Sequence, residues 1–600
     1  MMREPFERRD AEGVQTAGIV AAAVAAVVLL VLLGACWLAA QITGTGQGSP
    51  AQWVRAWFDD RPAWSSSATA LVLVSLVVVA VVTALAARQF GLWARWLDWR
   101  RRRRVDRMAR HLSAREDEEE LRQKACQRKA DRWGVPPECG PGLPLGKSVA
   151  FKAPLFSDFE LTMLALMGPR IGKTSALCIP QVCAFNGGPA VVATNKRDLC
   201  DHTRGVRSRL GRVFVHDVQQ IVQEKPSWTW DPLGFIAADD AKVARAQRLA
   251  GTFQACDGNR KETDAYFGPG GETLLANLML AATLQGHSIL ATLDWLADLK
   301  ANNEAAALGD PVEILAEHGY GEMSRQLKAD RSLTPKQLDG LVGTARQIMA
   351  FLRDPVVHQW VVADATRRPF DPAAFVTSTD TLYLLSMNEA GSARPVVTAL
   401  VMAVTDAAIK QAQRSGGGRL ARPMLLMLDE AANICPWPEL PDKYSYLGSH
   451  GIIPVTILQN RAQGVKAWGA EGMEQLESSA SVMLVGGGLR STRHLQDLSA
   501  LIGQRTERVT TASRGKAHRS RGEDFRRVDI FSTAQLANFP RMRAVAFTAG
   551  ARPVLIKLVP WWQGPHAESI AASNEHYAPA DVRAQQRAIA EGTTRKAVAA

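Results

Sequence analysis

The chain has 600 residues, too many for one hydrophobic core, so about two to four domains are expected. Its 47% hydrophobic and 22% charged residues are typical of globular proteins, and its net charge of +12 (71 basic minus 59 acidic residues) suggests an anionic partner, either nucleic acid or lipid headgroups. The eight cysteines form no paired CxxC framework, which excludes a structural zinc site and predicts reduced thiols in a cytoplasmic protein.

Two uncharged stretches near the N-terminus predict a membrane anchor over residues 1–100. They run from 17 to 40 and from 68 to 87, and each is long enough to cross about 30 Å of hydrocarbon. A cleaved signal peptide is the alternative for the first stretch, but the stretch is too long and a second one follows it. Arginines follow the second stretch, so the positive-inside rule predicts a multi-pass protein of the inner membrane with residues 100–600 in the cytoplasm.

A charged segment separates this anchor from the rest of the chain. The run Arg100–Arg104 has two interpretations, contact with anionic lipid headgroups or direct contact with nucleic acid. Residues 101–140 predict a helical stalk and linker, because Glu118 and Arg122 have i,i+4 spacing and a cluster of prolines follows them. A domain boundary is therefore expected near 135–145.

Short apolar runs alternate with helical stretches from Leu145 onward, which predicts an α/β fold. The apolar runs are bounded by turns, as in a parallel sheet buried on both faces. They lie at 161–167, 190–194, 213–216, 381–385, 424–428, 452–458 and 481–485. Helical patterns fill the gap between the two groups of runs. The sequence therefore predicts one α/β domain formed by 141–232 and 373–565, with an all-helical insertion over 233–372.

Two further segments have weaker patterns. Residues 505–527 are basic and contain two glycines, which predicts a mobile loop that either contacts nucleic acid or is simply solvated. The tail, 566–600, is rich in alanine, arginine and glutamate and is expected to be helical or loose.

A glycine-rich turn follows the apolar run that ends at Met167, and it predicts a phosphate-binding loop. Backbone N–H groups of such a turn, where it opens into a helix, bind phosphates. Lys173 would reach the β- and γ-phosphates of ATP, and the Thr174 hydroxyl would ligate Mg²⁺. The loop is one residue shorter than the usual pattern, which leaves open whether the Met167 or the Gly168 amide lies over the β-phosphate. The nucleotide-binding residues are Gly168, Pro169, Arg170, Ile171, Gly172, Lys173, Thr174 and Ser175.

A second run, Gly142–Ser148, has a similar pattern of glycine, lysine and serine. No strand is predicted before it and no helix after it. A phosphate loop needs both, because the strand positions the turn and the helix presents its N-terminal amides. The sequence therefore favours the loop that contains Lys173.

An acidic pair ends another apolar run and predicts the second half of a hydrolytic site. Asp429 would hold the Mg²⁺ shell, and Glu430 would polarise the attacking water. The alternative is a helix cap or turn acid. Gln459 ends the next apolar run, where it is either a sensor that orients water or an ordinary strand-end residue. Lys196, also at a strand end, is a further candidate for nucleotide binding.

Taken together, these patterns make the chain resemble the type IV coupling proteins of conjugation and secretion (TraG/TraD type). The resemblance covers roughly 145–560, and the anchor extends it to nearly the whole chain. The segments that carry it, besides the two spans, are 168–174, 191–199, 230–233, 381–385, 428–431 and 456–459 with Gln463.

That resemblance implies a RecA-like P-loop domain with an all-α insertion, in a hexameric ring at the inner membrane. The ring would use ATP and Mg²⁺ to move single-stranded DNA with its relaxase into a type IV secretion channel. The resemblance gives Lys173, Glu430 and Gln459 catalytic roles, and it makes Thr174 and Asp429 the Mg²⁺ ligands. It also implies an arginine finger from a neighbouring subunit, for which Arg394 and Arg461 are the candidates. The cargo does not carry over, because the insertion diverges.

Two other functions remain open. One is a double-stranded DNA pump of the FtsK kind, but residues 566–600 are too short for the usual C-terminal DNA reader. The other is a scaffold that binds nucleotide and recruits substrates without pumping, which the shortened loop permits. Turnover of ATP that depends on the substrate would separate a motor from a scaffold.

Overall fold

The structure is a computed structural model that describes residues 97–256, 267–297, 299, 308–387, 393–514 and 519–584. The predicted spans at 17–40 and 68–87 lie outside the described residues, as does the end of the tail. The chain divides into two compact units, Met1–Arg104 and Val105–Ala600. The described part of the first unit, 97–104, is helical, and all that follows concerns the second unit.

A mixed sheet forms the centre of the second unit. Among the described residues it has 11 strands, in the order β2-β1-β15-β14-β11-β3-β10-β9-β4-β8-β5. The strands from β11 to β5 in this order pair in parallel, whereas the four at the other end pair antiparallel. The parallel strands are β3 (Met163–Leu166), β4 (Ala190–Thr194), β5 (Val213–His216), β8 (Thr381–Leu385), β9 (Met424–Leu428), β10 (Ile452–Leu458) and β11 (Val482–Gly486).

These parallel strands confirm the predicted α/β fold with a large parallel sheet. Every apolar run that the sequence singled out is one of them, with small differences in the bounds of β3 and β11. The antiparallel strands were not predicted. They are β1 (Leu143–Ser148), β2 (Pro154–Ser157), β14 (Arg543–Thr548) and β15 (Val554–Lys557). The run at 142–148 is therefore an edge-region strand, β1, paired with β15 at Lys147 and Lys557.

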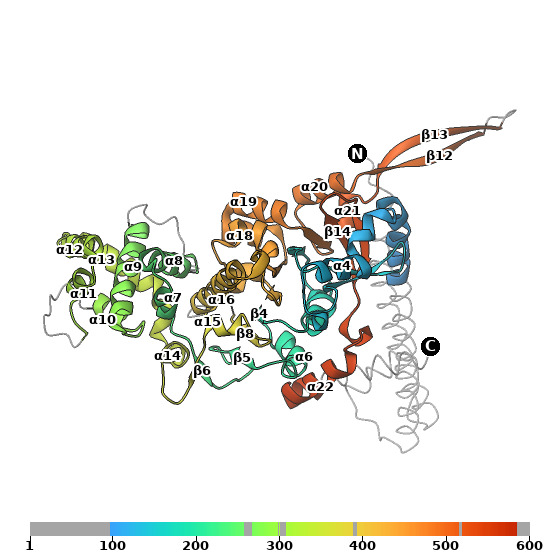
Figure 1. The fold of residues 1–600 in the computed structure, drawn as a ribbon. Coiled ribbons are helices and arrows are strands. Elements are labelled where there is room, and N and C mark those ends of the chain that lie inside the picture. The colour runs from blue at the N-terminus through green and yellow to red at the C-terminus, as the bar shows by residue number, and fades with distance from the viewer. Residues whose placement is uncertain are drawn as a thin grey trace, which may run out of the picture. The chain divides into compact units, whose positions relative to one another are not determined.

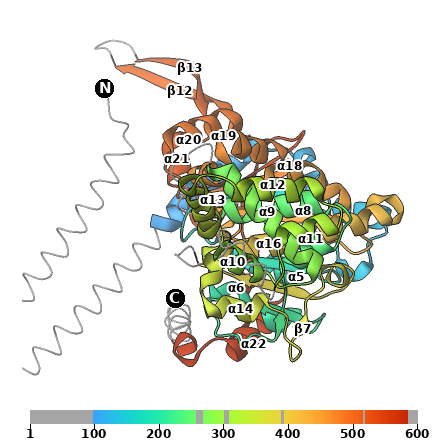
Figure 2. The ribbon, with the colours of Figure 1, turned by 90° about the vertical axis from the view of Figure 1, so that its left-hand side faces the viewer.

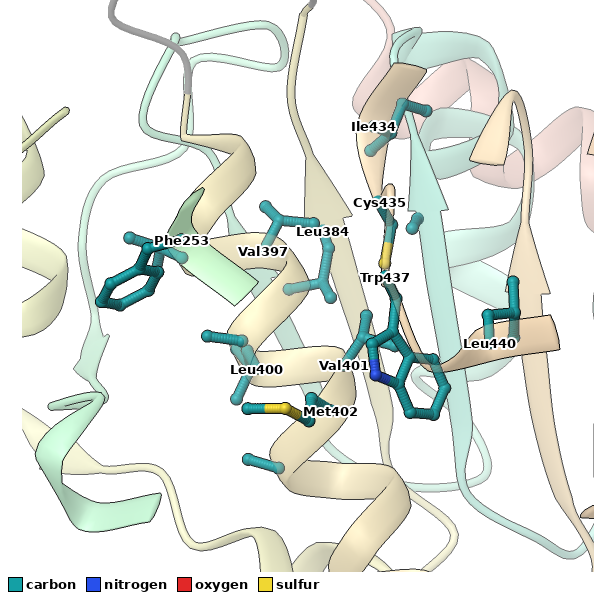
Figure 3. Packing of buried hydrophobic residues seen from close by; sticks show 14 of the residues in the cluster. Phe253, Leu384, Val397, Leu400, Val401, Met402, Ile434, Cys435, Trp437 and Leu440 are labelled. Carbon is teal, nitrogen blue, oxygen red and sulfur yellow. The ribbon is translucent and has the colours of Figure 1, made fainter. Parts of the chain in front are cut away.

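Both faces of the parallel sheet are covered by helices, which explains why its strands are continuous apolar runs. Leu164 and Leu166 of β3 belong to the core on one face, and Met163 and Ala165 belong to the core on the other. The first core includes α16 (Arg394–Arg414), whose Val397 side chain lies beside Leu384 of β8 in Figure 3. Within the described residues, α16 is the one helix long and apolar enough to cross a membrane, but 78% of its apolar window is buried inside the protein, as in a core helix.

The second core lies against the opposite face of the sheet. It receives the turn η3 (Thr174–Cys178), the helix α5 (Ile179–Ala184) that continues it, and α6 (Arg197–Arg207). The tail helix α22 (Ala567–Tyr577) packs on α6, where the Gly205 amide donates to Ser573 Oγ at 2.8 Å. All seven described cysteines are buried free thiols.

Helices fill the region of the predicted insertion and form a group of their own, drawn in green in Figure 1. They are α7 (Leu233–Ala237), α8 (Lys242–Ala255), α9 (Phe267–Gln285), α10 (Ala291–Ala297), α11 (Pro311–Glu317), α12 (Gly321–Arg331), α13 (Pro335–Ile348) and α14 (Pro355–Val361). Two short strands, β6 (Trp228–Thr229) and β7 (Arg368–Pro369), pair in parallel and bring the two ends of this region together. Arg248 of α8 bridges to Asp406 at 2.6 Å and to Glu439 at 2.6 Å, which ties the insertion to the α/β domain.

The segment for which a stalk was predicted packs against the sheet region. It contains the turn η1 (Glu116–Leu121) and α4 (Gln123–Arg132). The Glu118 carboxylate is fully buried, and it accepts a hydrogen bond from Ser148 Oγ of β1 at 2.7 Å and one from Arg122 at 2.9 Å. Asp106 forms an ion pair with Arg543 of β14 at 2.7 Å.

The prediction of a loop is wrong for 505–514 and 519–527, and residues 515–518 lie outside the described residues. Two strands, β12 (Gln504–Arg514) and β13 (Arg519–Asp529), run side by side there as an antiparallel pair (Figure 2). Threonine, valine and phenylalanine favour extended backbone. The hydrogen bonds between the two strands satisfy backbone N–H and C=O groups of both strands. The composition shows that this segment is charged and contains glycine, but it does not show that residues 504–514 pair with 519–529.

Candidate functional site

The candidate site lies at the carboxyl edge of the parallel sheet. Polar residues follow four adjacent strands there, β3, β10, β9 and β4, and this edge is where open parallel sheets bind ligands. The phosphate loop follows β3, Gln459 follows β10, Asp429 and Glu430 follow β9, and Asn195 follows β4. Parallel pairing brings these four strand ends together, although they are far apart in the chain.

The loop after β3 begins with two amides that are already engaged. Met167 N–H donates to Leu458 O at 3.0 Å, and Gly168 N–H donates to Gly487 O at 2.9 Å. Neither amide is therefore directed at a phosphate. The amides from Arg170 to Ser175 follow, at the start of a helix, where N–H groups lack intrahelical acceptors.

Backbone conformation and close packing explain the two glycines of the loop. A Cβ on Gly168 would lie 2.8 Å from the backbone of Gly488, in the loop after β11. Gly172 has φ +109°, and a Cβ there would lie 2.6 Å from Met542 Sδ. Arg170, between them, has a left-handed conformation with φ 61°. Pro169 and Arg170 are exposed, whereas Ile171 is buried.

The helix that the loop opens into begins with a π-helical turn, η3. Such turns are uncommon and occur often at functional sites. Lys173, directly before it, is buried, with 7% of its side chain exposed. Thr174 and Ser175 are half-buried at the start of the turn. Among the described residues, no hydrogen bond joins the Thr174 hydroxyl to Asp429.

Glu430 lies at the centre of the site. Its carboxylate accepts hydrogen bonds from Gln459 Nε2 at 2.7 Å and Asn195 Nδ2 at 2.8 Å, and it pairs with Lys173 Nζ at 3.3 Å. The exposed Lys196 ammonium is 3.6 Å away. Burial raises the pKa of the Glu430 carboxyl, but Lys173 and the other cations and donors outweigh burial and hold it below its usual range. Glu430 is therefore ionised at neutral pH.

The backbone at Glu430 has left-handed dihedral angles, φ 59° and ψ 43°. A non-glycine residue in this region costs on the order of 1 kcal/mol or more, and such residues cluster at functional sites. The reversal of the chain directly after β9 turns the Glu430 side chain toward Lys173, Asn195 and Gln459. The helix α17 (Ala431–Ile434) starts at the next residue.

Asp429 is deeper than Glu430, with 1% of its surface exposed. Burial raises the pKa of its carboxyl to about 6. Thr194 Oγ1 is 3.5 Å from one carboxylate oxygen, Oδ2, whereas the other, Oδ1, is buried without a hydrogen-bond partner. Buried polar atoms are nearly always satisfied, so an unpartnered carboxylate oxygen beside a phosphate loop fits the water shell of a divalent cation.

The residues present therefore fit a nucleoside triphosphate with Mg²⁺. The start of η3 provides amides and the Lys173 ammonium for phosphate oxygens, and Thr174 and Asp429 provide oxygens for the cation. The hydrogen bonds of Glu430 show that the structure brings Lys173 and Gln459 to the same carboxylate, a convergence that the sequence did not predict.

Sequence reasoning missed Asn195, because it singled out the neighbouring Lys196. The signal was the polar segment that ends β4, but only the pairing of β4 with β9 shows that Asn195 reaches Glu430. Asn433 Nδ2 is also 3.5 Å from Glu430 Oε2.

The two candidates for an arginine finger, Arg394 and Arg461, lie in different parts of the structure. Arg394 Nη2 donates to Cys256 O at 2.7 Å, near the insertion. Arg461 pairs with Glu477 at 2.9 Å and lines a groove of about 1310 Å³ together with Pro169, Gln459 and Arg490. Arg461 is therefore beside the site of its own chain, whereas Arg394 contacts Cys256, the residue that follows α8.

Residues 423–541 match a protein-family model described as the TraM recognition site of TraD and TraG. No curated protein matches the chain. Among solved structures it resembles the bacterial conjugative coupling protein TrwB in an unbound form, with 18% identity and a TM-score of 0.47 over 68% of this chain and 87% of that one. It also resembles TrwB in complex with ADP and Mg²⁺ (17%, 0.44, 68% and 87%) and VirB4 of Thermoanaerobacter pseudethanolicus (14%, 0.40, 71% and 98%).

Proposed function

We propose that the chain is a membrane-anchored P-loop ATPase of the type IV coupling protein family (TraG/TraD type), which the match of residues 423–541 to the TraD and TraG family model supports. It couples a DNA–protein substrate to a type IV secretion channel and drives the transfer by ATP hydrolysis. The observation that carries this proposal is the convergence of Lys173, Gln459 and Asn195 on the ionised Glu430 carboxylate. A structural helix cap or turn acid would not need three donors from three other strand ends.

The strand order supports a RecA-like nucleotide domain. The strand β10, which ends at Gln459, lies between β3 with its phosphate loop and β9 with its acidic pair. A polar residue at the end of that middle strand is therefore within reach of both halves of the site. In this arrangement Gln459 can report on the terminal phosphate to α19 (Arg461–Ser479), which begins two residues later.

Each residue of the site has a task in this proposal. When bound, ATP and Mg²⁺ supply the phosphoanhydride and the cation that neutralises its charge. Lys173 moves from the Glu430 carboxylate to phosphate oxygens, and Thr174 and Asp429 hold the cation. Glu430, released from Lys173, polarises the attacking water and accepts its proton, while Gln459 and Asn195 orient the carboxylate.

The remaining parts of the proposal concern location and partners. The uncharged stretches at 17–40 and 68–87 support a location in the inner membrane, with residues 100–600 on the cytoplasmic side. The substrate is single-stranded DNA with its relaxase, the partners are the proteins of the type IV channel, and the working form is a homo-hexameric ring. A cysteine introduced at Gly46 and labelled from outside intact cells, with none labelled at Ser113, is the expected topology result, and the reverse would exclude it.

Turnover of ATP by the full-length protein in detergent tests the function. Single-stranded DNA should increase the rate, and Lys173→Ala should abolish it. A protein that binds ATP but does not hydrolyse it with any DNA would be a scaffold. Stimulation by double-stranded DNA alone would favour a pump of the FtsK kind.

A further inference from the structure

An apolar cavity of about 270 Å³ lies along the flank of the helix that follows the phosphate loop. One of its walls is the face of that helix formed by Ala176, Pro180 and Ala184, which are spaced four residues apart. The opposite walls come from β1 and β2 and from the segment after β15, and they include Gly146, Leu155, Val559 and Trp561. None of the site chemistry described above uses this cavity.

The cavity begins one helical turn beyond Gly172 of the phosphate loop. Ala176 N–H donates to Gly172 O at 2.8 Å, so Ala176 is about 6 Å further along the helix than Gly172. Hydrogen bonds also join the far wall to the loop. Met542 N–H donates to Ile171 O at 3.2 Å, and Leu558 N–H donates to Met542 O at 3.1 Å. The phosphate loop and the cavity are therefore parts of one packed region.

Trp561 supplies an aromatic ring to this wall. The His202 ring holds it edge-on, with ring centroids 5.1 Å apart. Its neighbour Trp562 does not line the cavity and is 51% exposed. Polar side chains are few, and they are those of Lys147, Gln563 and His566. An apolar cavity with an aromatic wall and a few polar groups is the usual lining of a small-molecule site.

The run Gly142–Ser148, which resembles a phosphate loop in sequence, acquires a role here. A Cβ on Gly146 would lie 2.5 Å from Lys557 O, so glycine is required for β1 to approach β15. This close approach places Gly146 and Lys147 at the cavity wall. The glycine of the run serves the packing of β1 against β15.

We propose that this cavity binds the purine base of the nucleotide whose phosphates occupy the loop from Gly168 to Thr174. The inference rests on the proposed nucleotide-binding function and assigns the base half of the same ligand. The triphosphate and the base are joined by a ribose, so a base site must begin several ångströms from the phosphate site, and this cavity does. A flat aromatic base stacks on Trp561 and packs against Ala176 and Pro180, while Gln563 and His566 can bond to its ring nitrogens.

Equilibrium binding to the full-length protein in detergent tests this, with ATP compared with inorganic tripolyphosphate, a probe that has no base. Trp561→Ala should weaken ATP binding about tenfold, the scale of one lost base–aromatic stack, and leave tripolyphosphate binding unchanged. Trp561→Phe should restore most of the ATP affinity, because a ring remains. Trp562→Ala is the matched control and should bind both probes as the parent does.

A second variant guards against a folding effect at Trp561. Ala184→Phe narrows the far end of the cavity from the helix side, and it should also weaken ATP selectively. Thermal unfolding of each variant, measured without ligand, checks that the fold is kept. If the parent binds ATP and tripolyphosphate equally well, or if Trp561→Ala weakens both probes by the same factor, the base site is wrong although the phosphate site stands. If the parent binds neither probe, the proposed function itself fails.

Discussion

Lys173 and Glu430 are 257 positions apart in the chain, and their side chains form a buried ion pair 3.3 Å long. The lysine belongs to the phosphate loop and the glutamate to the acidic pair, so the contact joins the two halves of the site. A charge this deeply buried is costly when its partner is lost. Phosphate oxygens can replace the carboxylate as the partner of Lys173, and that exchange would free Glu430 to act on water.

Lys173→Ala should therefore reduce ATP affinity by about ten- to a hundredfold, the range expected for a lost hydrogen bond to a charged group. Lys196→Ala is the matched comparison, because the Lys196 ammonium is also near Glu430 but its side chain is 52% exposed. Exposed ion pairs contribute little binding energy, so Lys196→Ala should reduce ATP affinity by about twofold or less. Calorimetry measures the ATP affinity of both variants. An equal loss of affinity in Lys173→Ala and Lys196→Ala would contradict the assignment of the phosphate loop.

Glu430→Gln should separate binding from hydrolysis. The amide keeps the shape of the side chain but lacks the charge that polarises water. Lys173, Thr174 and Asp429 are unchanged, so ATP affinity should persist, whereas turnover should fall by roughly a hundredfold or more. Affinity and steady-state rate are measured on the same preparation. Hydrolysis at the parent rate would remove Glu430 from the mechanism.

Asn195 was not predicted, and two substitutions test its role. Asn195→Ala removes the 2.8 Å hydrogen bond to Glu430 Oε2 and should lower the turnover rate about tenfold. Asn195→Asp places a second carboxylate beside Glu430 and should lower the rate further, because two like charges repel. If Asn195→Asp turns over faster than Asn195→Ala, Asn195 does not act by donating to Glu430.

The carboxyl group of Asp231 should make the free energy of unfolding depend on pH. Burial raises the pKa of its carboxyl to about 6, against the backbone hydrogen bonds from Leu233 and Ile289. Because the folded-state pKa is above the unfolded value, the stability contributed by the protonated form is complete below about pH 4 and is lost as the pH rises through about 6. The loss is of order 3 kcal/mol, from a shift of about two pKa units.

Asp231→Asn does not titrate, and its oxygen can still accept the Leu233 N–H, which bonds Asp231 at 2.9 Å in the parent. Its thermal unfolding midpoint should therefore exceed that of the parent at pH 7.5 and approach it at pH 4.5. A difference between the two proteins that does not change with pH would show that Asp231 is not the titrating group.

Local patterns predicted much of the α/β domain. The seven parallel strands were found because strands buried on both faces are short apolar runs. The candidate phosphate loop and the acidic pair were singled out because each is a contiguous string of residues that follows such a run. The helix α11 (Pro311–Glu317) lies in the predicted helical insertion, and its N-terminus carries a local signal, since Asp310 accepts a hydrogen bond from Val312 N–H.

Patterns that depend on a partner strand were missed. The residues of β1 and β15 have no long apolar run. They form strands because they pair with each other, and because β1 also pairs with β2 and β15 with β14. The hairpin of β12 and β13 was taken for a loop for the same reason. Glu118 was used only as part of a helical stalk, but its carboxylate is buried and accepts hydrogen bonds from Ser148 and Arg122.

The amino-acid sequence by itself determined which residues of this protein could do chemistry, because a strand, a glycine turn and a pair of acids are encoded over a few neighbouring positions. Only the tertiary structure decided which of them meet. The order of β3, β10, β9 and β4 in the sheet brings Gln459 and Asn195 to Glu430, and the left-handed backbone at Glu430 turns its carboxylate toward Lys173. Strand order and side-chain direction follow from long-range packing, which no local pattern contains.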